Sequence, residues 1–360
     1  MKERKTELSV MNVFFSLLVI FIHTSAVPVT TLAKPSWQLA AVFTPWKLAS
    51  FVVYGFLFIG GIRFALHPPE PGIGGTLGFY RKKLVRILIP YIIWVTVYYL
   101  WLVVFSDVEF SLVKLAGCIF TGMAASHFYF VIIILQFFIL APVFRRFKPS
   151  NAAFVLPILL LLTLIFESSL PDLLGRVGLR DNFMWAGPFR NDRVFTSYLF
   201  YWAAGVYSGF AYDKAKDYVS KYRAGITVLW VAVSAAEVFF NYRTHAYADW
   251  FPMIQLLHHL FIIVSILFSF TWALKIKDLA FFRTKFFVLQ DRCSFSVFLS
   301  HLLVMNTFDH FAEIWWDLSI LKAYLLRIAV TYTVTIACCM TVALFSGKIK
   351  KKLLENKLKK

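Results

Sequence analysis

Charged residues are scarce in this sequence, and acidic residues are scarcer than basic ones. Only 16% of its 360 residues are charged, with 19 Asp and Glu against 37 Lys and Arg, while 60% are hydrophobic. A soluble domain of this length cannot bury so much apolar surface. The composition therefore excludes an ordinary soluble protein and predicts one that crosses a membrane several times.

Cysteine is also rare, and the four cysteines show no CxxC or other pairing pattern. Cys338 and Cys339 are adjacent, so on a helix their side chains point apart. No disulfide framework or thiolate metal site is implied. The sequence also lacks an HxxxH pattern and a carboxylate-rich cluster, so we expect no bound metal.

The net charge of +18 does not indicate a nucleic-acid-binding protein. Lys and Arg occur as short clusters between apolar segments, whereas nucleic-acid binding needs one continuous basic surface. These clusters concentrate in alternate loops and at both ends of the chain. The positive-inside rule then predicts that both termini are cytoplasmic.

The length of the apolar runs predicts an all-α, polytopic membrane protein. A bilayer core about 30 Å thick needs about 20 apolar residues per helix, and about ten segments meet this requirement. They are residues 8–27, 47–66, 87–106, 127–145, 152–170, 195–212, 224–241, 252–274, 287–308 and 323–346. Residues 111–122 are too few to span and predict an interfacial or re-entrant helix. We expect residues 1–346 to form one membrane domain and residues 347–360 to form a basic cytoplasmic tail.

The first apolar run, VFFSLLVIFIHTSAV at residues 13–27, carries a histidine, His23. Counted from Leu8, His23 lies about 22 Å along the helix and therefore in the outer half of the bilayer. A neutral imidazole there can accept a proton from a hydroxyl nucleophile. The alternative is a histidine that only forms a hydrogen bond between helices.

A basic cluster precedes the third run, in FYRKKLVRILIPYIIW at residues 79–94. Lys83 and Arg86 are three residues apart and share a helix face at the cytoplasmic surface. Together with Arg81 and Lys82, such a face can hold the phosphates of a donor molecule. An ordinary positive-inside cluster would look the same.

Outer-side groups are candidates for binding a substrate. The longest polar insert, residues 171–194, mixes Arg, Asp and Trp185, which can hydrogen-bond to a sugar and stack on it. An ordinary polar loop is the alternative. We take His127, Trp185 and Arg190 as the substrate-binding candidates.

Two charged residues within the spans, Glu237 and Arg327, lie near outer helix ends. We expect their side chains to extend from there into water.

These segments, in order, resemble the membrane acyltransferase 3 family, which O-acylates cell-surface glycans in bacteria. The resemblance covers nearly the whole chain. It rests on ELSVMNVFFSLLVIFIH, FYRKKLVRILIPYIIW, HFYFVIIILQFFILAPVF, YLFYWAAGVYSG and SFSVFLSHLLVMN.

The resemblance implies a protein of the bacterial cytoplasmic membrane that takes an acyl group, acetyl being expected, from cytoplasmic acyl-CoA. The acceptor would be a hydroxyl of an extracytoplasmic or exported polysaccharide. His23 corresponds to the family's catalytic histidine, and Arg86 to its donor-side arginine. The implied partners are a coenzyme A thioester, a carbohydrate and membrane lipid.

Two positions depart from the family pattern. Asn12 stands where the family usually has an arginine, which replaces a cation with a neutral amide. We include Asn12 with His23 among the catalytic candidates. Lys83 replaces the first arginine of RxxR and keeps the charge without the bidentate fork.

Two other functions are alternatives. The chain could be a transporter or flippase for a glycan or lipid-linked precursor, without acyl transfer, although no paired half-repeat with broken helices is visible. It could also be a structural partner in a polysaccharide synthase complex.

Overall fold

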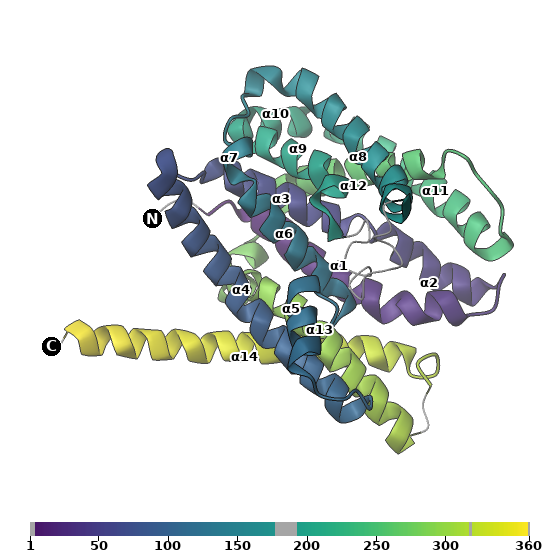
Figure 1. Ribbon diagram of the computed structural model, residues 1–360. Helices are drawn as coiled ribbons and strands as arrows, with labels where there is room; N and C mark the ends of the chain where they lie inside the picture. Colours follow the sequence, from purple (N-terminus) through teal and green to yellow (C-terminus); the bar gives the residue numbers. More distant parts are fainter. Residues whose placement is uncertain (1–3, 177–192, 317–318, 359–360) are drawn as a thin grey trace. The chain divides into compact units, whose positions relative to one another are not determined.

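The computed structural model describes residues 4–176, 193–316 and 319–358. Within these ranges every regular element is a helix (Figure 1). A helix forms all of its backbone hydrogen bonds within one segment, as a chain surrounded by lipid requires. The predicted all-α, polytopic fold is confirmed.

The number of helices able to cross a membrane is close to the predicted one. Within the described ranges, eight segments are long and apolar enough, and a bent pair of helices makes nine if it counts as one span. The sixth predicted span, 195–212, forms only a 3₁₀ turn and the 12-residue helix α9 (Leu199–Phe210). At 1.5 Å per residue α9 is about 18 Å long, too short to cross alone. Its residues Trp202 and Val206 are fully buried, so protein rather than lipid surrounds them.

The chain divides into two compact units. The first comprises Met1–Val52 and Val219–Lys360, and the second comprises Val53–Tyr218. The first therefore joins both ends of the chain in one helical cluster. Its helices are α1 (Thr6–Thr31), α2 (Trp37–Leu48), α11 (Arg223–Tyr247), α12 (Ile254–Ile276), α13 (Lys285–Trp316) and α14 (Tyr324–Leu358), with the 3₁₀ turn η6 (Ala280–Arg283) before α13.

Helix α1 is the centre of the first unit. It packs against α2, α12, α13 and α14. Phe15 on its buried side is fully enclosed and meets the ring of Phe51 edge-on at 5.4 Å. Polar side chains on α1 are therefore presented mainly to other helices of the same unit.

The second unit contains the remaining helices. They are α3 (Val52–Leu66), α4 (Gly72–Phe105), α5 (Leu112–Thr121), α6 (Tyr129–Ile139), α7 (Ala141–Phe144), α8 (Ala152–Arg176), α9 and α10 (Tyr212–Lys221), with short 3₁₀ turns at Ser126–Phe128, Pro149–Asn151 and Phe195–Tyr198.

Glycines let α3 and α9 approach closely in the second unit. A methyl group added to Gly205 of α9 would collide with the carbonyl of Phe58, and one added to Gly61 of α3 would collide with that of Trp202. Such small-residue contacts are a usual way for membrane helices to associate. The approach lets Trp202 stack on Phe137 with ring centroids 4.7 Å apart.

The short helix predicted at residues 111–122 is α5. Ser111 caps its first turn by accepting a hydrogen bond from the backbone of Lys114, and Gly122 ends it with a φ of 68°. Only glycine adopts that conformation without strain. The chain then bends by 50° into the segment Ser126–Ile139.

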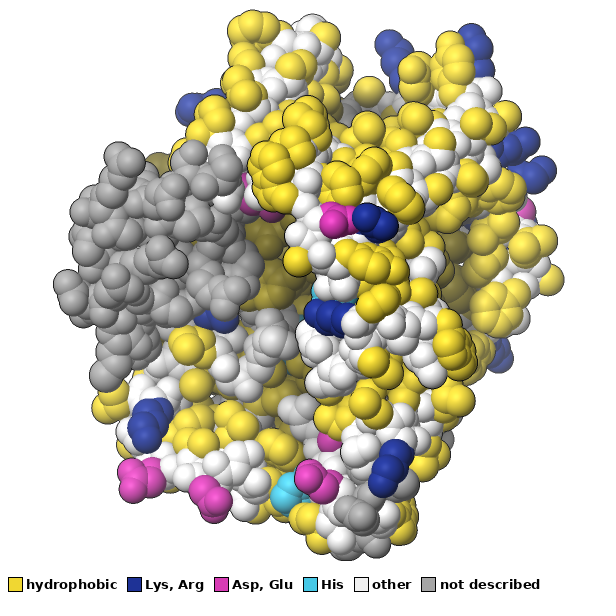
Figure 2. Space-filling view, turned by 90° about the vertical axis from the view of Figure 1, so that its right-hand side faces the viewer, with side chains coloured by type: hydrophobic (Ala, Val, Ile, Leu, Met, Phe, Trp, Pro, Cys, Tyr) yellow, Lys and Arg dark blue, Asp and Glu magenta, His cyan; other side chains and the backbone are white. Residues whose placement is uncertain are grey.

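The surface agrees with a membrane location. Among the described residues on the face shown in Figure 2, hydrophobic side chains are much more frequent than charged ones. Lipid contact explains an apolar exterior that water would oppose.

Candidate active site

Two histidines face each other in the first unit, His23 on α1 and His301 on α13. Their ring centroids are 5.2 Å apart and the rings are tilted by 45°. His23 follows the start of α1 by 17 residues, or about 26 Å. His301 is completely buried, whereas His23 is partly exposed. His23 is therefore the less buried residue of the pair.

Backbone carbonyls determine which nitrogen of His301 carries its proton. Its Nδ1 lies 2.8 Å from the carbonyl oxygen of Phe298 and 3.2 Å from that of Val297. A carbonyl only accepts, so Nδ1 is the donor and, in the neutral ring, Nε2 is an acceptor. His301 is thus held in one tautomer beside His23.

A buried ion pair lies at the same end of α1. Arg327 of α14 donates from Nε and Nη2 to the two carboxylate oxygens of Asp309 on α13, each at 2.7 Å. Its third nitrogen donates to the carbonyl of Thr24, the residue after His23. A fork-to-fork pair of this kind is a strong, directional contact.

The expectation that Arg327 extends into water is wrong. Its side chain is 1% exposed, because Asp309 and the Thr24 carbonyl satisfy it inside the protein. Arg327 is also within electrostatic range of His23. A cation that acts on the candidate base therefore comes from α14. Ser25 and Tyr324 join α1 to the same helix through a 2.8 Å hydrogen bond between their hydroxyls.

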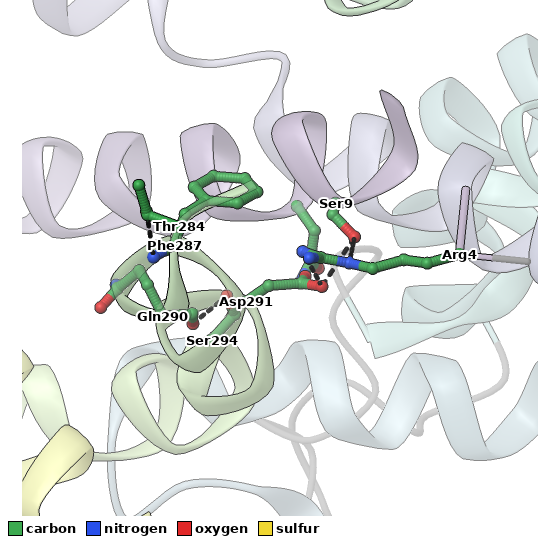
Figure 3. Close-up of polar contacts among 8 residues, drawn as sticks. Arg4, Ser9, Thr284, Phe287, Gln290, Asp291 and Ser294 are labelled. Carbon is green, nitrogen blue, oxygen red and sulfur yellow. Dashed lines mark hydrogen bonds and ion pairs between the residues drawn. The ribbon is translucent and has the colours of Figure 1, made fainter. Parts of the chain in front are cut away.

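Asn12 belongs to a different cluster, centred on Asp291. The Asn12 amide donates to one carboxylate oxygen of Asp291 at 2.9 Å. Arg4 and Ser9 both donate to the other oxygen, at 3.1 and 2.7 Å (Figure 3). Asn12 precedes His23 by eleven residues, about 16 Å along α1. The structure therefore does not bring Asn12 and His23 together, and the cation beside Asp291 is Arg4.

Glu237 is the centre of a further buried cluster, on α2, α11 and α12. Its Oε1 accepts from Lys47 Nζ at 3.0 Å and from His258 Nδ1 at 2.6 Å. The Glu237 side chain is 0% exposed. The expectation that it extends into water is wrong, because two partners inside the protein replace water.

The basic residues predicted to bind a donor lie on α4 in the second unit. The ammonium group of Lys83 lies over the rings of Phe79 and Phe138, 5.9 and 5.8 Å from their centroids. Its electrostatic neighbours are Arg63, Lys82 and Arg86. The structure thus brings three of the predicted residues together and adds Arg63 from α3, while Arg81 is an exposed neighbour in sequence.

The three substrate-binding candidates are not gathered into one described site. His127 is 2% exposed and packs between Tyr98 and Phe128 in the second unit. Trp185 and Arg190 lie outside the described residues.

Sequence reasoning missed several polar residues of the first unit. Lys47, His301, Asp309 and Arg327 received no role, although a charge within a span is costly and usually functional. Arg327 was noted as a charge within a span, and the cost of such a charge is a reason to search for a carboxylate partner inside the protein.

Comparison with known proteins identifies the family of this chain. Residues 6–344 match the acyltransferase domain of the acyltransferase 3 family. Similar proteins include those of Staphylococcus aureus strains MSSA476 and MRSA252, each named a probable poly-beta-1,6-N-acetyl-D-glucosamine export protein. Each is 22% identical over 324 residues, 88% of this chain and 87% of the relative. No solved structure matches the chain.

The match runs through nearly all of the membrane helices, the His23 cluster and the α4 basic cluster included. A multi-pass protein of this family and composition is located in the bacterial cytoplasmic membrane. The chain belongs to the acyltransferase 3 family, and it is a multi-pass membrane O-acyltransferase.

Proposed function

We propose that the protein transfers an acetyl group from cytoplasmic acetyl-CoA to a hydroxyl of an extracytoplasmic or exported polysaccharide. One observation carries the proposal. The imidazole of His23 is held beside the ring of His301 and within electrostatic range of Arg327, which pairs with Asp309. A site that deprotonates a hydroxyl needs such a base.

In this mechanism His23 is the general base. Its imidazole takes the proton of the sugar hydroxyl, and the oxygen forms a bond to the thioester carbonyl carbon. The carbon–sulfur bond then breaks, and the imidazolium returns the proton to the departing thiolate. His301 and the Arg327–Asp309 pair are positioning groups that hold α1, α13 and α14 around His23.

The α4 cluster is the proposed donor site. Arg63, Lys82 and Arg86 are all cations within electrostatic range of Lys83. Such a group repels itself and gains stability when phosphates bind. Arg81 would add charge at the edge of this cluster, and the ammonium group of Lys83 lies over two aromatic rings. We expect Lys83→Ala and Arg86→Ala to raise the KM for acetyl-CoA more than they lower kcat.

Other assignments rest on the sequence. His127, Trp185 and Arg190 are the proposed contacts with the carbohydrate. Asn12 is assigned a positioning role through Asp291, because it lies about 16 Å from His23 along the helix. Membrane lipid and a polysaccharide synthase complex are the proposed partners. Residues 1–346 are the proposed membrane domain, and residues 347–360 are its proposed basic tail.

Export is the second candidate function, because the similar staphylococcal proteins are named for it. The two functions make different predictions in vesicles that contain the purified protein. We would supply isotopically labelled acetyl-CoA and an N-acetylglucosamine oligomer, and measure both saccharide-bound label and saccharide movement. Acyl transfer predicts label on oxygen; export predicts movement that continues without acetyl-CoA and leaves the saccharide unlabelled.

A further inference from the structure

A cavity of about 630 Å³ lies in the first unit, between α1, α12, α13 and α14. Met11 and Phe287 are deep in its wall, at 1% and 2% exposed. Phe14 and Phe286, at 48% and 54%, form part of its rim. This volume is in the range of small-molecule binding sites. The cavity thus opens through an aromatic rim onto the lipid-facing surface.

One buried amide lines this apolar cavity. Gln290 of α13 is 4% exposed, and among the described residues neither its amide oxygen nor its amide nitrogen has a hydrogen-bond partner. Figure 3 shows its side chain extending away from Asp291, the adjacent residue that binds Arg4 and Ser9. A buried amide without partners is costly, so the site is suited to a ligand that brings a polar group to it.

The cavity also has a direction. Along α1 it extends from Val10 to Leu17, which is about 10 Å of helix. Gln290 is near the start of α13, about 8 Å into the helix. By the predicted orientation this is the cytoplasmic side, at the depth of lipid ester groups. If the ester carbonyl of a lipid bound to Gln290, the acyl chain attached to that ester would therefore extend along the cavity toward Leu17 and the bilayer centre.

Two lysines are close in sequence to residues of the cavity wall. Lys275 follows the wall residues Trp272 and Ala273 on α12, and Lys285 directly precedes the rim residue Phe286. Both lysines are exposed. Basic residues at the cytoplasmic surface attract anionic lipid headgroups.

We propose that this cavity binds one acyl chain of an anionic phospholipid from the cytoplasmic leaflet. The Gln290 amide donates a hydrogen bond to the ester carbonyl, the apolar wall holds the chain, and Lys275 and Lys285 face the phosphate. The proposal is independent of acyl transfer, and its test measures binding alone.

The experiment uses the full chain in lipid nanodiscs with phosphatidylglycerol that carries a photoreactive group on one acyl chain. We expect labelled peptides from residues 10–17 and 286–290. Leu17→Trp, which fills the cavity, should reduce this labelling, whereas Val342→Trp should not, because Val342 is 67% exposed on α14 and outside the wall. Equal labelling in both variants would overturn the proposal.

Gln290→Leu gives a second test, which does not depend on tolerance of a large side chain. It should weaken binding about threefold to tenfold, the effect of one hydrogen bond. Replacing the probe's ester by an ether should weaken binding to the wild type by a similar factor and leave Gln290→Leu unaffected. Equal loss in both proteins would contradict the contact with Gln290. Labelling by phosphatidylcholine as strong as by phosphatidylglycerol, or stronger competition by palmitoyl-CoA than by phosphatidylglycerol, would overturn the choice of ligand.

Discussion

Replacing Asp309 by Asn should destabilise the first unit strongly. Arg327 is 1% exposed and Asp309 is 18% exposed, and two 2.7 Å hydrogen bonds join them. Asp309→Asn leaves the more deeply buried charge without its partner, which costs about 3–5 kcal/mol. Arg327→Met leaves a carboxylate that still reaches some water, so its cost should be smaller, about 1–3 kcal/mol. Asp309→Leu combined with Arg327→Met should cost little, because two apolar groups then replace the pair.

Denaturant unfolding in lipid nanodiscs measures these differences. Asp278→Asn is the matched control, since Asp278 pairs with Arg283 at 3.3 Å while both side chains are about 70% exposed (72% and 70%). An exposed pair contributes about 0–1 kcal/mol. If Asp309→Asn cost no more than Asp278→Asn, or the double variant cost as much as Asp309→Asn, the buried pair would not stabilise the unit as described.

Three other substitutions test separate parts of the structure. Glu237→Gln should lower stability by about 3–5 kcal/mol, since it leaves Lys47, whose side chain is only 13% exposed, without its carboxylate, and nanodisc unfolding would measure the loss. Gly205→Ala should destabilise the second unit by separating α3 from α9, whereas Gly225→Ala, with open space around its Cα, should be neutral or stabilising in the same thermal assay. In Asn12→Arg, the new arginine should take over the contact that Arg4 makes with Asp291. Adding Arg4→Ala should therefore lower the stability of the wild type but not that of Asn12→Arg. An equal loss of stability in the two backgrounds would show that the two cations do not share one site.

Helix positions could be predicted from the sequence because apolar length alone determines them. The short helix at 111–122 was also predictable, since it is too short to span. The sixth predicted span was wrong, because the apolar residues of α9 pack against protein and not against lipid. Hydropathy does not distinguish a helix buried in protein from one that faces lipid. Trp202, enclosed by aromatic rings, is the clearest case.

The partners of His23 could not be predicted from the sequence in the same way. His301 and Arg327 lie 278 and 304 residues further along the chain, and nothing in the local pattern of α1 indicates which helices pack against it. Asn12 was grouped with His23 because it stands where the family usually has an arginine. The rise of 1.5 Å per residue separates them into two clusters.

The basic cluster was predictable in part. The i, i+3 spacing of Lys83 and Arg86 identified one helix face, and the structure agrees that they are neighbours. Arg63 was not assigned to it because the contact between α3 and α4 is tertiary. Close helix packing at glycines and contacts between helices produce no periodic pattern of residues that a single sequence would reveal.

The role of His23 is tested most directly by the rate of O-acyl transfer in reconstituted vesicles. We would compare His23→Ala with His67→Ala, an exposed histidine of the second unit, at equal folded protein. Loss of a general base predicts a kcat lower by about 10²–10⁴ in His23→Ala, with His67→Ala at the wild-type rate. Wild-type transfer by His23→Ala would contradict the account.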